Sequence, residues 1–181
     1  MAYRKTIKIK LQRPILGCRR DEEEVYRLDT CTSSGHLAWA LDQAQWAWAL
    51  KQGAEVLEYD FVDTSCIRLP LTVEIAGVTP YVRNFRDKKG KLCEQQFEAI
   101  RSSSTISVPV TVLDVEDGVA YKGDPPTPGQ LTAIFGVVGD SVGISPFGNR
   151  FGYGRFDVLE EDETGKDDSN GQKHESGTET A

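Results

Sequence analysis

The chain has 181 residues and a net charge of −7, with 39% hydrophobic and 27% charged residues, which is enough apolar material for one domain with a buried core. No apolar run approaches the roughly 20 residues that cross a bilayer, and the N-terminus lacks the pattern of a secretory signal. We therefore expect a cytoplasmic protein with no membrane partner.

The negative charge is concentrated at the C-terminal end. Residues 160–181 hold eight Asp or Glu and two Lys, which is −6 of the total −7, so residues 1–159 carry about −1. This segment has no apolar side chain larger than Ala, so it cannot bury enough surface to offset the entropy of ordering. We predict a disordered acidic tail at 160–181 and a single folded domain at 1–159.

The cysteines do not form a metal-binding or redox pattern. Cys18, Cys31, Cys66 and Cys93 are 13, 35 and 27 positions apart, with no C-x-x-C pair and no nearby histidine that would complete a zinc site. The spacings of dinucleotide-binding and phosphate-binding glycine motifs are also missing. We expect reduced cysteines, no metal and no cofactor.

The N-terminal third predicts a strand and then a helix. Residues 3–11 alternate between polar and apolar side chains, which indicates a half-buried strand whose outer face is basic through Arg4, Lys8 and Lys10. Residues 22–28 are expected to include a short helix. A longer helix is expected from Ser33 or Ser34 to about Gln52, with three tryptophans that widen its apolar face beyond the needs of one sheet.

The middle of the chain is rich in strand patterns. Residues 56–62, 67–76 and 105–114 read as strands, and residues 81–100 read as a hairpin that turns at 87–90 and is inserted at approximately 77–101. The hairpin is a candidate contact surface through its basic side chains Arg83, Arg86, Lys88 and Lys89. A solvated hairpin tip would explain the same charges.

The C-terminal part predicts a helix and a last strand. Thr127 caps a helix that begins at Pro128 and ends near Val142, and residues 155–159 read as a strand. Without the inserted hairpin, the order is strand, helix, strand, strand, helix, strand. We therefore predict an α+β, ferredoxin-like (βαββαβ) antiparallel sheet with two helices on one face.

A loop between that helix and that strand combines glycines, aromatics and arginines. Pro146 to Gly154 reads as a tight loop, since glycine permits positive φ and close backbone approach. Its arginines suit phosphates and its rings suit unpaired bases. The candidate binding residues are Phe147, Asn149, Arg150, Phe151, Tyr153 and Arg155. The alternative is a strand end in which glycine permits a bulge and rings fill the core, as we expect for Phe156.

The same segment resembles the glycine-rich loop before the last strand in the RAMP superfamily of CRISPR proteins, particularly small phage- and prophage-encoded relatives of the backbone subunit. Gly143, Gly152 or Gly154, Arg155 and Phe156 fit the pattern, and Ser145-Pro146-Phe147 departs from it. The resemblance implies a ferredoxin-like fold, single-stranded RNA binding and, for a phage protein, a location in the bacterial host cytoplasm. Some members cleave RNA with a histidine, for which the candidate here is His36.

We predict from these features a non-enzymatic protein of phage or prophage origin that binds single-stranded nucleic acid, either RNA or DNA. The acidic tail would compete with the ligand or dock a protein partner. The first alternative is an interaction or self-assembling subunit that forms homo-oligomers. The second is a metal-independent ribonuclease that uses His36 as a general base.

Overall fold

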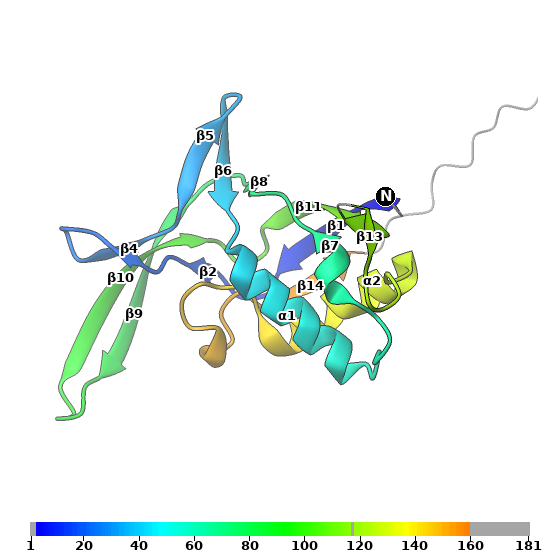
Figure 1. Ribbon diagram of the computed structural model, residues 1–181. Coiled ribbons are helices and arrows are strands. Elements are labelled where there is room, and N and C mark those ends of the chain that lie inside the picture. The colour runs from blue at the N-terminus through cyan, green and yellow to red at the C-terminus, as the bar shows by residue number, and fades with distance from the viewer. Residues whose placement is uncertain (1–2, 117, 160–181) are drawn as a thin grey trace, which may run out of the picture.

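The computed structural model describes residues 3–116 and 118–159 of the chain (Figure 1). The acidic segment 160–181 and its predicted disorder lie outside the described residues. Within the described ranges the chain forms fourteen strands and two α-helices, with short 3-10 turns at Thr64–Cys66 and Asn149–Phe151. Neither α-helix of this part is long and apolar enough to cross a membrane.

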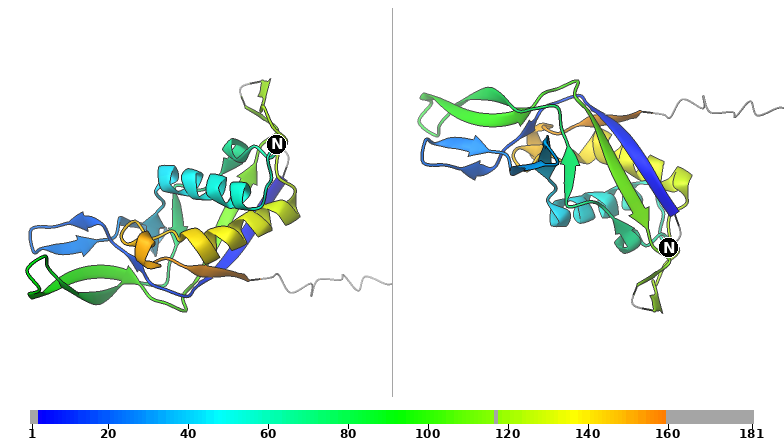
Figure 2. Two further views of the ribbon diagram at one scale, coloured as in Figure 1. Left: turned by 90° about the horizontal axis from the view of Figure 1, so that it is seen from below. Right: turned by 90° about the horizontal axis from the view of Figure 1, so that it is seen from above.

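The body of the molecule is a four-stranded antiparallel sheet covered by both helices. It contains β1 (Tyr3–Leu11), β7 (Ile67–Arg68), β11 (Thr105–Val112) and β14 (Phe156–Leu159) in the order β14-β1-β11-β7. The helices α1 (Gln43–Val56) and α2 (Pro128–Val137) lie on one side of this sheet, while β1 and β11 are uncovered when seen from the other side (Figure 2). We call the uncovered side the outer face.

The alternation predicted for residues 3–11 is confirmed and explains this arrangement. Ile7, Ile9 and Leu11 are buried against the helices, whereas the even-numbered residues of β1 are exposed on the outer face. The main core gathers side chains from every element of the body, namely Trp46 and Leu50 of α1, Leu131 and Phe135 of α2, Val108 and Val110 of β11, and Phe156 of β14. Burial of Phe156 is as predicted.

The second helix begins as its sequence indicates. The Thr127 side chain accepts a hydrogen bond from the backbone of Gln130, the Gln130 side chain accepts one from the backbone of Thr127, and Pro128 occupies the first turn. After Val137 the chain continues as a π-helical turn at Val138–Val142 that ends at Gly143. The helical segment therefore ends where the sequence predicted, with one wider turn at its end.

A second sheet projects from the body. It contains β2 (Ile15–Leu16), β3 (Arg19–Arg20), β4 (Val25–Arg27), β9 (Thr79–Arg86) and β10 (Leu92–Ile100), with β10 between β9 on one side and β2 and β4 on the other. The β9–β10 hairpin extends away from the helices (Figure 1). We call these five strands the arm.

Two smaller sheets complete the described chain. The strands β5 (Thr30–Ser33), β6 (His36–Ala40) and β8 (Thr72–Glu74) form one, and β12 (Val115–Glu116) pairs with β13 (Val119–Ala120) in the other. In Figure 1 the β5–β6 hairpin points in a different direction from the β9–β10 hairpin, so the body carries two separate projections.

The predicted ferredoxin-like fold with one inserted hairpin is wrong. The chain is mostly β, with fourteen strands in four sheets within residues 3–116 and 118–159, and only four of those strands belong to the sheet that the helices cover. The prediction failed because it assigned residues 17–53 to connection and helix, whereas four short strands, β3 to β6, lie there before α1.

Three local predictions are also wrong. The helix expected from Ser33 or Ser34 begins only at Gln43, because residues 36–40 pair with both β5 and β8 as a strand. The strand expected at 56–62 is the end of α1 and a turn, and the short helix expected at 22–28 contains strand β4. In each case pairing with a distant strand or continuation of the helix overrode local propensity.

Candidate nucleic-acid interface

The glycine-rich segment 143–155, called the glycine loop below, folds back on itself. The amide of Ile144 donates to the carbonyl of Gly154 at 3.1 Å, and Gly154 has a φ of 74°. A Cβ at Gly154 would lie 2.2 Å from the backbone nitrogen of Ser145, so no larger residue fits without displacing the backbone. The predicted tight loop is confirmed, and the close backbone approach explains one of its glycines.

A buried serine attaches this loop to the arm. Ser145 is fully buried; its Oγ accepts a hydrogen bond from the amide of Leu16 at 2.9 Å and donates one to the carbonyl of Phe147 at 2.6 Å. From the helix side, the Gln45 side chain donates to the carbonyl of Ser145 at 2.9 Å. Sequence reasoning missed Ser145, because nothing in its local pattern shows that the loop and β2 meet.

Two of the predicted stacking rings hold the loop to the arm. Phe147 is half-buried, with its ring centroid 4.7 Å from Phe97 and 5.7 Å from Tyr26. Tyr153 is only 6% exposed and meets the edge of Tyr81 at 5.8 Å. The stacking role predicted for Tyr153 does not fit this burial, because its ring presents no face to a ligand. Phe147 and Tyr153 belong instead to a small core that joins loop and arm.

Tyr153 also carries a polar contact inside this small core. Its hydroxyl lies 3.1 Å from the hydroxyl of Tyr81, and the guanidinium of Arg13 lies 5.1 Å from its ring centroid. The hydrogen bond to Tyr153, and secondly burial, raise the pKa of Tyr81. The Tyr81 phenol is therefore neutral at ordinary pH, and the contact is structural.

The exposed part of the glycine loop is the Phe151 ring, which has the Arg83 guanidinium packed against it. Phe151 is 60% exposed, and the guanidinium carbon of Arg83 on β9 lies 4.5 Å from its ring centroid. The same carbon lies 5.8 Å from the ring of Phe147 and 6.0 Å from that of Phe85. Cation–π contacts of this kind contribute about 0.5–2 kcal/mol each. The loop and the hairpin, predicted as two separate surfaces, thus meet at Arg83.

The other predicted loop residues surround this contact. Arg150 is exposed, and Asn149 is half-buried at the start of the turn Asn149–Phe151. Arg155 is half-buried immediately before β14, and its Nε is buried without a hydrogen-bond partner among the described residues. Arg150 is therefore the predicted loop arginine that solvent reaches most freely.

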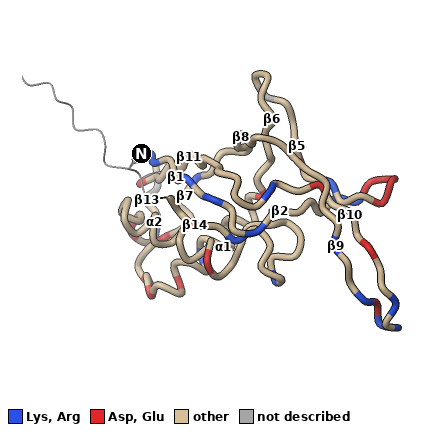
Figure 3. Tube along the Cα trace, turned by 180° about the vertical axis from the view of Figure 1, so that it is seen from behind, with Lys and Arg blue, Asp and Glu red and all other residues tan. Residues whose placement is uncertain are grey.

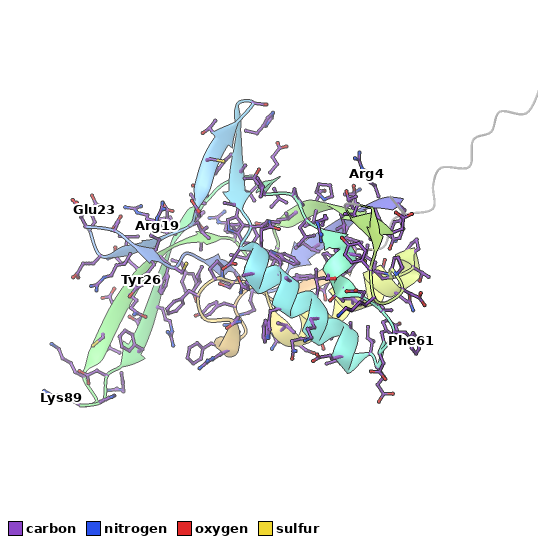
Figure 4. All side chains as sticks on the ribbon, in the orientation of Figure 1. Arg4, Arg19, Glu23, Tyr26, Phe61 and Lys89 are labelled. Carbon is purple, nitrogen blue, oxygen red and sulfur yellow. The ribbon has the colours of Figure 1, made fainter. Side chains whose placement is uncertain are left out.

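The predicted cations of the hairpin lie on both faces of β9 and at the turn. Side chains alternate along a strand, so Arg83 and Arg86 point to opposite faces of β9, and only Arg83 faces the loop. Arg86 donates to the carbonyl of Gly90 at 2.8 Å, which places it with the turn. Lys88 and Lys89 are exposed at the tip (Figure 4). The tip is basic, but it is not continuous with the Phe151 surface through side-chain contacts.

The remaining predicted cations lie on the outer face of the body. Arg4, Lys8 and Lys10 are exposed, and Figure 3 shows basic positions along β1. Within residues 3–116 and 118–159 none of the three forms an ion pair. The register with β11 sets Thr111, Ser107 and Thr105 beside them, so hydroxyls alternate with cations across the two strands. Such a surface offers hydrogen bonds and charge to phosphates, but no rings for bases.

A groove lies at the base of the arm, where β1, β9 and β10 come together. It has a volume of about 420 Å³ and is lined by residues that include Pro14, which follows β1, Tyr81 of β9, and Arg101, which follows β10. Arg101 is exposed. The groove thus carries one exposed cation at the base of the arm.

The candidate catalytic histidine lies elsewhere. His36 belongs to β6 rather than to a helix start, is exposed, and its Nδ1 lies 2.9 Å from a carboxylate oxygen of Glu74. It therefore stands on the β5–β6 projection, which is separate from the glycine loop and arm in Figure 1. Among the described residues no group of three His, Cys, Asp or Glu side chains could hold a metal ion.

Comparison with known proteins leaves the family open. The sequence matches no protein-family model and none of the curated proteins. One solved structure with a similar chain is titled "CRISPR RNA-guided surveillance complex"; the alignment has a TM-score of 0.46 and 15% identity, and it covers 85% of this chain and 66% of that chain. This likeness is too distant to carry an argument about function. The resemblance to the RAMP superfamily stays a prediction, and the predicted phage origin has no support.

Proposed function

We propose that the chain is a non-enzymatic protein that binds single-stranded nucleic acid, with Phe151 as its stacking platform. The observation that carries the proposal is the exposed Phe151 ring held against the Arg83 guanidinium at 4.5 Å. Large rings are normally buried, and a ring kept 60% exposed by a cation from another element suits a ligand with a flat face.

The chemistry around Phe151 fits a nucleotide better than an apolar ligand. A base that stacks on the ring places its phosphates within the field of Arg83 and of the exposed Arg150. Bases in a duplex are already stacked and paired, so an aromatic platform selects single strands. The proposal applies to RNA and to DNA alike.

The bound strand would extend from the loop to the outer face. The groove beside Arg101 supports this direction, and the cations and hydroxyls of β1 and β11 suit backbone phosphates without base contacts. In Figure 4 Arg4 lies at the opposite end of the molecule from Lys89 at the tip of the arm. A nucleic acid that contacted every predicted cation would therefore have to extend along the whole length of the protein. We propose the loop and the outer face as the track, with the tip as an accessory.

The proposal is tested by comparing two exposed aromatic residues. Phe151→Ala removes the platform, whereas Trp48→Ala removes a ring that is 50% exposed on α1, outside the proposed track. Loss of one base–aromatic stack weakens binding by about 1–3 kcal/mol, which is roughly 5- to 150-fold in Kd. Fluorescence anisotropy with labelled single-stranded RNA, single-stranded DNA and duplex, over a salt series, measures this.

The two variants give a clear decision. The proposal expects Trp48→Ala to bind like the wild type, Phe151→Ala to lose affinity for single strands, and both to weaken with added salt. If Phe151→Ala and Trp48→Ala bind single strands equally well, or if the wild type binds none at low salt, the glycine loop is only a structural attachment for the arm.

A second candidate function is assembly with other protein chains. The observation in its favour is that apolar side chains stand exposed on the arm face opposite Arg83, with Val82 at 48% and Leu92 at 61%. A second exposed apolar group lies along and beyond α1, at Trp48, Val56 and Phe61. Exposed apolar groups of this kind mark protein contacts. A mass in solution of several chains that is unchanged by nuclease, together with no affinity for nucleic acid, would select this function.

The ribonuclease alternative is addressed by the same preparations. Labelled RNA incubated in chelator with wild type and His36→Ala would reveal metal-independent cleavage that depends on the histidine. We expect no cleavage by either, because His36 lies against the Glu74 carboxylate on a projection away from the proposed track.

A further inference from the structure

The sheet of the body has an open edge on β1. Strand β1 pairs with β11 along Tyr3–Lys10, but it pairs with β14 only along Lys8–Leu11. On the side where β14 lies, residues 3–7 therefore have no partner strand anywhere in the described part of the chain. Such an edge offers unpaired amide and carbonyl groups to another strand.

The direction of the free groups follows from two hydrogen bonds. The amide of Leu11 donates to the carbonyl of Ser104, beside β11, and the next amide, that of Gln12, donates to the carbonyl of Arg155, beside β14. Because successive amides along a strand point to opposite sides, even-numbered residues of β1 face the β14 side. The free amides and carbonyls are those of Arg4 and Thr6.

The chain itself leaves β14 toward this edge. Leu159 is paired with Lys8 in an antiparallel ladder, so a continuation of this ladder beyond Leu159 would run past β1 in the direction of Tyr3. The same register would set Glu161 opposite Thr6, Asp162 opposite Lys5 and Glu163 opposite Arg4. Opposite charges directly across a ladder are favourable. Two of the first acids after β14, Asp162 and Glu163, would thus lie opposite the cations Lys5 and Arg4 of β1.

We propose that the acidic segment 160–181 of this same chain docks on the open β1 edge and the outer face. The segment carries a net charge of −6, and the exposed side chains that it would meet are Arg4, Lys8 and Lys10. Its 22 residues span up to about 70 Å when extended, whereas the nine residues of β1 span about 30 Å, so the segment is long enough to follow the edge and fold over the face.

Docking there would regulate the proposed binding. It would neutralise the outer face and leave the Phe151 platform open, so a nucleic acid would have to displace the segment to occupy the whole track. This consequence rests on the proposed function. The docking itself does not, and it is measured without any nucleic acid.

The experiment is lysine labelling of the full chain with a water-soluble acylating reagent, read by mass spectrometry. The wild type is compared with a variant in which all eight acids of 160–181 are changed to Asn or Gln. We expect Lys8 and Lys10 to be labelled about fivefold more slowly in the wild type, a factor that corresponds to about 1 kcal/mol. Lys88 and Lys89 at the tip of the arm serve as internal controls and should react equally in both chains.

A second readout tests the register. Amide hydrogen exchange at Arg4 and Thr6 should be slow in the wild type and faster in the amide variant, because only a docked strand covers these two groups. A control variant with Glu22→Gln and Glu94→Gln removes exposed acids elsewhere and should behave as the wild type. Added salt should abolish the protection of the lysines.

The outcomes separate the two proposals. Equal labelling of Lys8 in both chains overturns the docking, and protection that grows with protein concentration overturns it in favour of the segment of a second copy. If the lysines are protected but no chain binds nucleic acid, the docking stands and the proposed function fails. If single strands bind equally to both chains and the lysines are never protected, the proposed function stands and the docking fails.

Discussion

The hydroxyl of Ser145 is a fully buried polar group that joins the glycine loop to the arm. Ser145→Ala would leave the amide of Leu16 without a partner, and both residues are fully buried. A buried donor left unsatisfied costs about 1–3 kcal/mol, and the bond from the hydroxyl to the carbonyl of Phe147 is lost as well. We expect a total loss of about 2–3 kcal/mol in the free energy of unfolding.

The assay is urea unfolding followed by tryptophan fluorescence, with thermal unfolding as a check. The expected loss corresponds to a fall in Tm of about 4–12 °C for a chain of this size. The matched control is Ser141→Ala, since Ser141 is exposed and its hydroxyl meets only Asp140, at 3.3 Å. We expect the control to change stability by less than about 0.5 kcal/mol. If both variants unfold alike, the amide of Leu16 has another partner and the attachment described for the loop is incorrect.

Two further predictions concern backbone space and acid. Gly154→Ala should destabilise the chain more than Gly152→Ala in the same unfolding assay. Both glycines have positive φ, but only at Gly154 would a Cβ meet backbone atoms. Equal losses of stability in the two variants would contradict the close backbone approach at Gly154. The ion pair with Arg27 holds the pKa of Asp21 below its ordinary value of 3.8, so its contribution to stability is present above that pH and is lost as the pH falls through the lowered value. The stability difference between wild type and Asp21→Asn should therefore shrink between pH 5 and pH 2, and a constant difference would show that the pair does not stabilise the fold.

The sequence carried enough information for the elements whose signals are local. The alternation of β1, the turn before Lys91, and the capping box at Thr127 all depend on residues within a few positions of each other, and each was predicted correctly. The glycine loop was found for the same reason. Its partner was not, because the contact between Phe151 and Arg83 joins positions 68 residues apart, and no periodicity relates them.

The β5–β6 hairpin was missed although two local signals were present. Ser34 and Gly35 both have positive φ, at 51° and 81°, which is the conformation of a tight hairpin turn and is favoured by a Ser-Gly pair. Asp42 caps α1 by accepting from the amide of Gln45, so it marked the true start of the helix. The run of Ala, Leu and Trp after Gly35 outweighed both signals, since those residues favour helix when their strand partners are unknown.

The buried tyrosine could not have been recognised from the loop alone. Tyr153 and Phe151 lie two residues apart between glycines, and the sequence offers no basis for ranking one as core and the other as exposed. Their different burial follows from their partners on β9: Tyr81 packs its ring edge against Tyr153, and Arg83 places its guanidinium against Phe151. The residue types of the loop predicted that aromatic rings could stack on a ligand. Which of the rings is exposed enough to do so depends on its partner in the folded structure.

The small core that joins loop and arm has a mechanical consequence. It contains four buried residues, Leu16, Phe97, Ala99 and Tyr153, whereas the main core of the body is several times larger. The arm is anchored to both cores, since Ile15 of β2 and Ile100 of β10 belong to the main core, while the Arg83–Phe151 contact adjoins the small one. Between Tyr81 and Phe97 no residue of the hairpin belongs to either core, so a force applied at the tip would reach the body first through the small core and the Arg83–Phe151 contact.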